Sequence, residues 1–92
     1  MNNQRNETYL NHPTFGLLYR ICLIQSDREL FTTLYAQRLF FIVNFEADRF
    51  SFEPMSRSEA RLLVENRLRR LRNANSPQEY QQLQAVYKRT FL

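Results

Sequence analysis

Residues 29–45 read ELFTTLYAQRLFFIVNF, and the structure of this apolar stretch decides the fold of the chain. As one helix, it would place Arg38 on the apolar face, and its threonines, phenylalanines and β-branched residues oppose helix propensity. As a hairpin, residues 30–34 and 39–45 would be two strands of β-forming composition with a polar break between them. Composition favours the hairpin, but it leaves open whether Tyr35 packs over the sheet or is exposed at the tip.

The segments on either side of this hairpin extend the predicted sheet. Residues 17–23, LLYRICL, form a candidate strand, and the polar residues 25–29 read as the turn that follows it. Phenylalanines alternate with polar residues in residues 49–53, which is typical of a half-exposed strand, and Pro54 is expected to end it. Because Gly16 is the single glycine, type I′ turns cannot supply most strand connections.

Two helices are predicted after the strands. Residues 56–59, SRSE, match a capping box, in which the serine hydroxyl and the glutamate carboxylate bind free amides at a helix start. A second start follows a three-residue connection, with Ser76 as N-cap and Pro77 at N1. The two helices are expected at about residues 57–73 and 77–91. Their apolar lines are Ala60, Leu63, Val64, Leu68 and Leu71 in the first and Tyr80, Leu83, Tyr87 and Phe91 in the second.

These elements predict an α+β fold, in which a small antiparallel β-domain precedes a two-helix C-terminal hairpin. Residues 1–8 are polar and lack periodicity, so we expect a flexible N-terminal arm. The β-domain is assigned to residues 9–54 and the two helices to residues 55–92. A chain of 92 residues buries only about 60–65% of its unfolded surface, so the core is expected to be modest.

The composition argues against several classes of function. Cys22 is the only cysteine and lies in an apolar run, which indicates a core residue. Because a single cysteine cannot form an internal disulfide and no apolar leader follows Met1, we expect a cytoplasmic location. His12 is the only histidine, and beside a proline it is expected to hydrogen-bond a turn rather than bind a ligand. We therefore predict no metal, no cofactor and no enzymatic activity, and no apolar run is long enough to span a membrane.

The net charge of +4 is concentrated in residues 57–72, which contain six arginines and two glutamates. Two interpretations are open: these arginines bind nucleic-acid phosphates, or they form a solvated helix face. In the second case they pair with Glu59 and Glu65 or contact an acidic protein partner. Residues 77–84, PQEYQQLQ, carry no positive charge at the start of the second helix. This argues against direct DNA binding through that helix. A small basic nucleic-acid-binding module remains the alternative function.

Four segments closely resemble the PipX family: YLNHPTFG at residues 9–16, LYAQRLFF at 34–41, EARLLVENRLR at 59–69 and YKRTFL at 87–92. The resemblance covers nearly the whole chain from Tyr9 onward. It implies a Tudor-like β-domain followed by two helices, and it favours two strands with an exposed tip for the opening stretch. Tyrosine and arginine at such a tip are the residue types that dominate interface hot spots.

The resemblance also implies partners and a regulatory role. Members of the family bind the PII signal protein and NtcA, a dimeric transcription factor that the bound protein supports as a coactivator. Binding to NtcA is expected when 2-oxoglutarate is high, and capture by PII when 2-oxoglutarate is low and ADP is high. No direct contact with DNA or with a membrane is implied.

By this resemblance, the surface shared by both partners is centred on Tyr35. The other assigned contact residues are Gln37, Arg38, Leu39, Tyr9, Phe15, Glu7, Leu17 and Phe41. The helices are expected to swing away from the β-domain on one partner. That movement would expose a second interaction face for a further transcriptional regulator or RNA polymerase, formed by Arg57, Arg61, Arg69 and Arg72.

Overall fold

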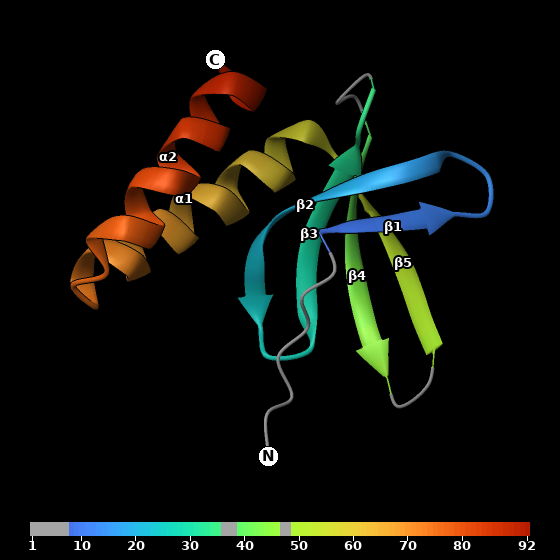
Figure 1. Ribbon diagram of the computed structural model, residues 1–92, viewed down its shortest axis with the longest axis horizontal. Helices are drawn as coiled ribbons and strands as arrows, with labels where there is room; N and C mark the ends of the chain where they lie inside the picture. The colour runs from blue at the N-terminus through green and yellow to red at the C-terminus, as the bar shows by residue number, and fades with distance from the viewer. Residues whose placement is uncertain (1–7, 36–38, 47–48) are drawn as a thin grey trace.

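The computed structural model describes residues 8–35, 39–46 and 49–92 and shows a curled antiparallel sheet followed by two helices (Figure 1). The predicted α+β class is confirmed. The elements are β1 (Tyr9–His12), β2 (Gly16–Gln25), β3 (Arg28–Thr33), β4 (Phe40–Glu46), β5 (Arg49–Met55), α1 (Arg57–Asn73) and α2 (Pro77–Phe91).

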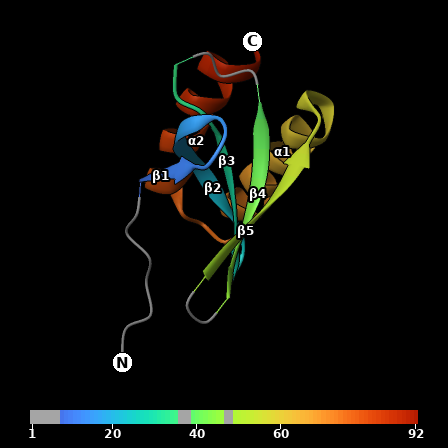
Figure 2. The same ribbon diagram turned by 90° about the vertical axis from the view of Figure 1, so that its right-hand side faces the viewer.

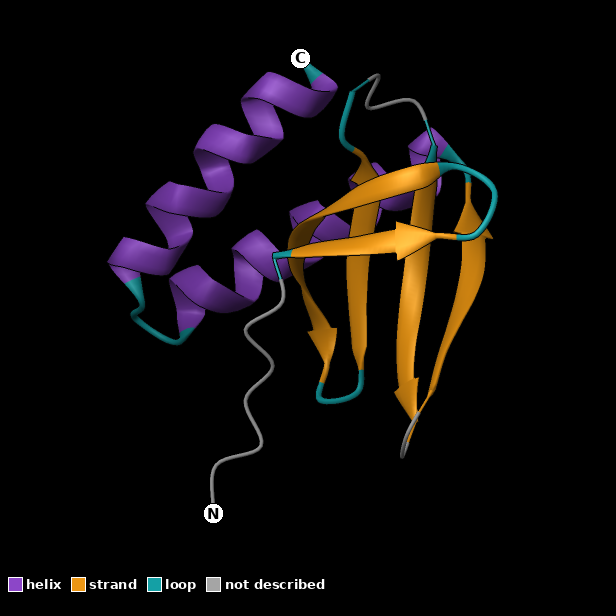
Figure 3. Cartoon of the chain, turned by 45° about the vertical axis from the view of Figure 1, so that its right-hand side comes forward, coloured by secondary structure: helices purple, strands orange, loops and turns teal. Residues whose placement is uncertain are grey.

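The sheet has the strand order β1-β2-β3-β4-β5, so each strand pairs with the next one along the chain. Residues 29–45 therefore form two strands, with Leu30 opposite Ile42 and Phe31 opposite Phe41, and the helical alternative is excluded. The sheet curls so that β1 and the adjoining part of β2 cross in front of β4 (Figures 1 and 3), and a view turned by 90° shows this hairpin to one side of β3 and β4 (Figure 2). On the other side of these strands α1 runs behind them, and α2 lies beside the sheet, packed against α1 (Figure 3).

Both faces of β3 and β4 are buried, which explains why residues 40–43 of β4 form a continuous apolar run rather than an alternating one. One face packs against the helices, and the other lies inside the curl of the sheet. The core between sheet and helices contains Ile21, Cys22, Leu30, Phe40, Ile42, Ala60, Val64, Leu71, Leu83 and Phe91. The core inside the curl contains Leu10, Leu18, Phe31, Phe41, Val43 and Phe45.

The predicted turn at residues 25–29 is too long, because β3 already begins at Arg28. Two charged residues enter the strand with polar partners: Arg20 Nε donates to the buried Glu29 Oε1 at 2.9 Å, and Arg28 bonds Asn44 and Glu53. A buried carboxylate without such a partner would be costly. The sequence alone could not show these cross-strand pairs.

The expectation that Pro54 ends its strand is also wrong, since β5 continues through Pro54 to Met55. In the pairing register Pro54 lies opposite Phe41 and Met55 lies opposite Phe40. Because β5 is an edge strand, its outward-facing backbone positions need no amide donor for the ladder, and proline is tolerated there.

The first helix begins as the sequence predicts. Ser56 Oγ accepts from the Glu59 amide at 3.0 Å, and Glu59 Oε1 accepts from the Ser56 amide at 3.0 Å. The hydrogen bond from the Ser56 amide, followed by that from the Ser56 side chain, lowers the pKa of the Glu59 carboxyl. At the second helix Pro77 occupies the first turn as predicted, but Ser76, with ψ 73°, makes no side-chain capping bond. A helix start whose first residue is proline already has one fewer amide to satisfy.

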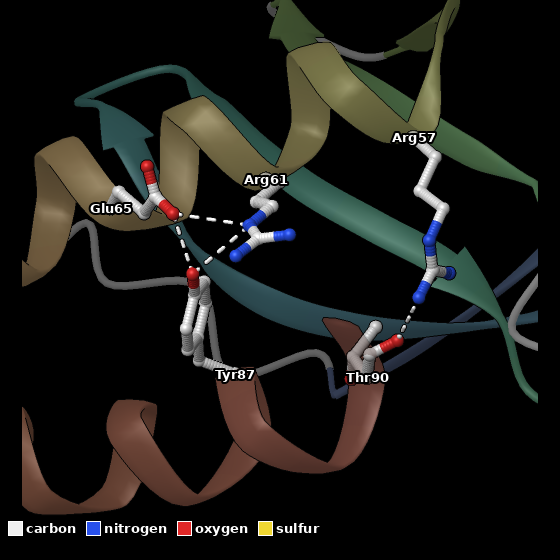
Figure 4. A network of polar contacts seen from close by, with 5 residues as sticks. All are labelled: Arg57, Arg61, Glu65, Tyr87 and Thr90. Atoms are coloured by element: carbon white, nitrogen blue, oxygen red, sulfur yellow. Dashed lines mark hydrogen bonds and ion pairs between the residues drawn. The ribbon is translucent and has the colours of Figure 1, made fainter. Parts of the chain in front are cut away.

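The end of α2 is held against both the sheet and the start of α1. The Phe91 ring stacks on Phe40 with the centroids 5.4 Å apart. Arg57 lies over the same Phe91 ring, and its guanidinium donates to the Thr90 carbonyl oxygen at 2.9 Å (Figure 4). Residues from both ends of the C-terminal unit therefore meet beside the first residue of β4.

Two leucines of α1 provide a matched test of this core. Leu71 is 5% exposed and Leu62 is 59% exposed. We expect Leu71→Ala to lower the free energy of unfolding by about 2–4 kcal/mol, because it leaves a cavity between the helices and the sheet. Leu62→Ala is expected to change it by less than about 0.5 kcal/mol. Equal losses for the two variants in urea unfolding would contradict this packing.

The buried thiol of Cys22 makes the stability of the fold depend on pH. Burial raises the pKa of Cys22 from 9.0 to about 12, so the thiol ionises in the unfolded chain first as the pH rises. Stability from this group is therefore complete below pH 9 and falls between pH 9 and 12, by about 1 kcal/mol per pH unit at the steepest. In Cys22→Ala this part of the slope should disappear. Identical slopes for the variant and the native protein in urea unfolding across this range would contradict the assignment.

Candidate functional site

The connection between β3 and β4, residues 34–39, is fixed at its base by both strands and by β2. The Thr33 amide donates to the Leu39 carbonyl oxygen at 3.1 Å, and Thr32 Oγ1 donates to the same oxygen at 2.8 Å. On the other side, the Leu34 amide donates to the Leu17 carbonyl oxygen at 3.0 Å. The residue before Tyr35 is thus tied to the β1–β2 hairpin.

Tyr35 is 89% exposed, which settles the alternative that the sequence left open in favour of an exposed side chain. Leu39, at the other end of the same connection, is 40% exposed. The predicted contact residues Gln37 and Arg38 lie between them, outside the described residues. Two of the four predicted tip residues can therefore be placed, and both present apolar surface to solvent.

The turn between β1 and β2 presents a second exposed aromatic residue, Phe15, which is 49% exposed. His12 Nδ1 accepts hydrogen bonds from the Thr14 amide at 3.0 Å and the Phe15 amide at 3.2 Å. This confirms the expectation that His12 bonds a turn. Gly16 follows with a φ of 77°, a conformation that residues with a side chain rarely adopt. The hydrogen bond to His12 thus fixes the backbone of Phe15 within the turn.

The His12 ring also packs among aromatic side chains. Its centroid lies 5.0 Å from Phe15, 4.9 Å from Phe41 and 4.6 Å from Phe52. Phe41 is only 4% exposed and its centroid lies 5.8 Å from Phe15. Phe41, which the resemblance assigned to the contact surface, is thus largely buried, with the rings of His12 and Phe15 packed against it.

The remaining predicted contact residues differ in accessibility. Tyr9 is 51% exposed and its ring centroid lies 5.9 Å from that of Tyr19, its register partner on β2. Leu17 is half-buried, and Glu7 lies outside the described residues. We call Tyr9, Phe15, Tyr35 and Leu39 the tip surface, since all four are exposed on the β1–β2 hairpin or the adjoining β3–β4 connection.

Sequence reasoning missed the residues that support the tip surface. Thr32 and Thr33 bind the Leu39 backbone, and Tyr19 and Phe52 pack beside Tyr9 and His12. Two adjacent threonines in a strand are an ordinary β-forming pair. Their role depends on the register between β3 and β4, which no local pattern fixes.

The four arginines predicted to form a second interaction face, Arg57, Arg61, Arg69 and Arg72, differ in whether they contact α2. Arg61 Nε donates to Glu65 Oε2 and to the Tyr87 hydroxyl oxygen, both at 3.1 Å, and the Tyr87 hydroxyl donates to Glu65 (Figure 4). The Tyr87 bond and then the Arg61 bond lower the pKa of the Glu65 carboxyl. With Arg57 bound to Thr90, two of the four predicted face residues join α1 to α2 in this structure.

The other two arginines are exposed and make fewer contacts. Arg69 donates to the Asn66 side-chain oxygen at 2.8 Å, while Arg72 forms no ion pair with the residues that the structure describes. Among these same residues, no group of three or more metal-ligating side chains is close enough to hold an ion. Neither α1 nor α2 is long and apolar enough to cross a membrane.

A curled sheet that presents exposed aromatic side chains beside a helical hairpin defines a small protein-interaction module. The model of the family described as PipX, PII-interacting protein X, matches residues 6–91. Because the match spans nearly the whole chain, the chain belongs to the PipX family, which is a family of PII-interacting regulatory proteins. No curated protein matches the sequence.

The threonine contacts at the base of the tip can be tested directly. Thr32→Val keeps the shape of this buried side chain but removes the hydrogen bond to the Leu39 carbonyl. We expect a loss of about 1 kcal/mol in stability and faster hydrogen exchange of the Thr33 amide, which bonds the same carbonyl. Thr14→Val, at an exposed position of the β1–β2 turn, is the control. Unchanged exchange of the Thr33 amide in Thr32→Val would contradict this role.

Proposed function

We propose that this protein is a non-enzymatic regulatory adaptor that binds either PII or the transcription factor NtcA through the tip surface. It binds the active, 2-oxoglutarate-bound NtcA dimer as a coactivator, and PII sequesters it when 2-oxoglutarate is low and ADP is high. Both events belong to the cytoplasm. The observation that carries the proposal is the family match over residues 6–91, combined with the exposure of Tyr35 on a connection that is fixed at its base.

Tyr35 has the physical properties of an interface anchor. An exposed tyrosine offers a large, rigid contact area and a hydroxyl group, and such residues often dominate binding energy. The strands that carry it are buried on both faces, so these strands lose little conformational entropy when a partner binds. Leu39, Phe15 and Tyr9 extend the contact, with Gln37, Arg38 and Glu7 as further proposed contacts.

Competition and population shift are sufficient for the regulatory effect. A protein that binds the active conformation of NtcA more tightly than the inactive one favours the active form without contacting DNA. If PII uses the same tip surface, its binding lowers the concentration of protein available to NtcA. One surface therefore couples the state of PII to the state of the transcription factor.

The helices provide a second proposed surface. If α2 moves away from α1, Arg57 is released from Thr90, and Arg61 is released from Tyr87. Together with Arg69 and Arg72, these guanidinium groups would form a basic face for a further transcriptional regulator or RNA polymerase. The contacts in Figure 4 are those that such a movement must break.

Replacement of the proposed anchor tests the shared surface. Tyr35→Ala should weaken binding to PII and to NtcA by about 2 kcal/mol or more each, which is about thirtyfold in Kd, and leave the circular dichroism spectrum unchanged. Phe50→Ala is the matched control. Phe50 is also an exposed aromatic residue, 46% accessible, but it lies near the β4–β5 turn at the opposite end of the sheet.

Calorimetric titration of both variants with ADP-bound PII and with 2-oxoglutarate-bound NtcA gives the comparison. We expect only Tyr35→Ala to lose affinity, and to lose it for both partners. Native affinity of Tyr35→Ala for either partner would contradict the shared anchor, and an equal loss for Phe50→Ala would show an effect on the fold instead.

A further inference from the structure

An open groove of about 270 Å³ lies between α1 and α2, away from the tip surface. It is bordered by one face of each helix, because its residues recur at helical spacing on both. The groove is lined by Glu65, Leu68, Arg69 and Arg72 from α1 and by Tyr80, Gln84, Tyr87, Lys88 and Leu92 from α2 and its C-terminal end.

The charges in this groove are not balanced. Arg69, Arg72 and Lys88 contribute three positive charges, and Glu65 contributes the one negative side chain of the lining. Glu65 already accepts hydrogen bonds from Tyr87 and from Arg61, whose guanidinium neutralises it. Neither Arg72 nor Lys88 forms an ion pair with any residue in the described part of the chain. The excess of positive charge among the side chains of the lining favours an anionic ligand.

The rest of the lining suits a flat ring. Tyr80 and Tyr87 are half-buried aromatic side chains, and Leu68 is a half-buried aliphatic one. Aromatic side chains beside cationic ones are the combination that binds nucleotides without base specificity, since the ring stacks and the phosphate is neutralised. Arginine in particular matches a phosphate with two parallel hydrogen bonds. The volume of about 270 Å³ suits a small molecule or one unit of a polymer.

We propose that this groove binds a nucleoside phosphate, with the phosphate against Arg69, Arg72 and Lys88 and the base against Tyr80 or Tyr87. The nucleotide is either free or one unit of a single-stranded nucleic acid, since both present the same ring and phosphate. This site is independent of the tip surface, so its test does not depend on binding to PII or NtcA.

Chemical-shift titration of the full-length protein, at a fixed salt concentration near 0.15 M, tests the proposal. The probes are AMP, adenosine, inorganic phosphate and a short single-stranded RNA. We expect AMP to bind more tightly than adenosine or phosphate and to shift the amides of the groove residues. Tighter binding of the RNA than of AMP, by more than about tenfold, would identify a strand as the source, and otherwise the free nucleotide is the ligand.

Two double variants separate a site from general attraction of charge. Arg72→Gln/Lys88→Gln removes two groove cations, and Arg70→Gln/Arg89→Gln removes two exposed cations from the same helices outside the groove lining. We expect the first to weaken AMP binding by about tenfold or more and the second by less than about twofold. Equal weakening by both variants, or no shift of groove amides at millimolar AMP, would overturn the proposal.

Discussion

Burial of both faces of β3 and β4 is the constraint on which the rest of the structure depends. One face of these strands packs on the helices through Leu30 and Ile42, and the other packs inside the curl through Phe31 and Val43. A single sheet can cover both of its faces in this way only if it curls and a second layer covers its outer side. The helices provide that layer, and the β1–β2 hairpin closes the other side.

The same constraint gives the tip surface its properties. A strand pair buried on both sides is rigid, and its connecting residues are the first that can reach solvent. Tyr35 is exposed there, while Phe41, one residue into β4 from Phe40, is already covered by His12 and Phe15. The exposure of Tyr35 and the burial of Phe41 thus follow from the position of each residue relative to the end of the strand pair.

Much of the fold was predictable from local patterns. The capping box at Ser56, the apolar stripe of α1 and the β-forming composition of the β3 and β4 segments each depend on neighbouring residues, and the structure confirms them. The sequence predictions were wrong at positions where contacts with distant segments determine the secondary structure. Glu29 belongs to a strand because Arg20 pairs with it, and β5 continues through Pro54 because it is an edge strand.

The candidate site was less predictable. Composition left the orientation of Tyr35 open, and the resemblance to the PipX family supplied the expectation that the structure supports through exposure. The arginine face shows the opposite case, since helical spacing placed four arginines on one helix without showing that α2 binds two of them. Such contacts depend on the packing of the two helices, which periodicity does not specify.

The central claim is that one surface serves two partners in turn, and a competition measurement tests it most directly. The native protein is bound to 2-oxoglutarate-bound NtcA, ADP-bound PII is added in increasing amounts, and the species are resolved by sedimentation velocity. The account predicts that the NtcA complex is replaced by the PII complex, with no species containing all three proteins. A stable ternary complex that forms at stoichiometric PII would contradict it.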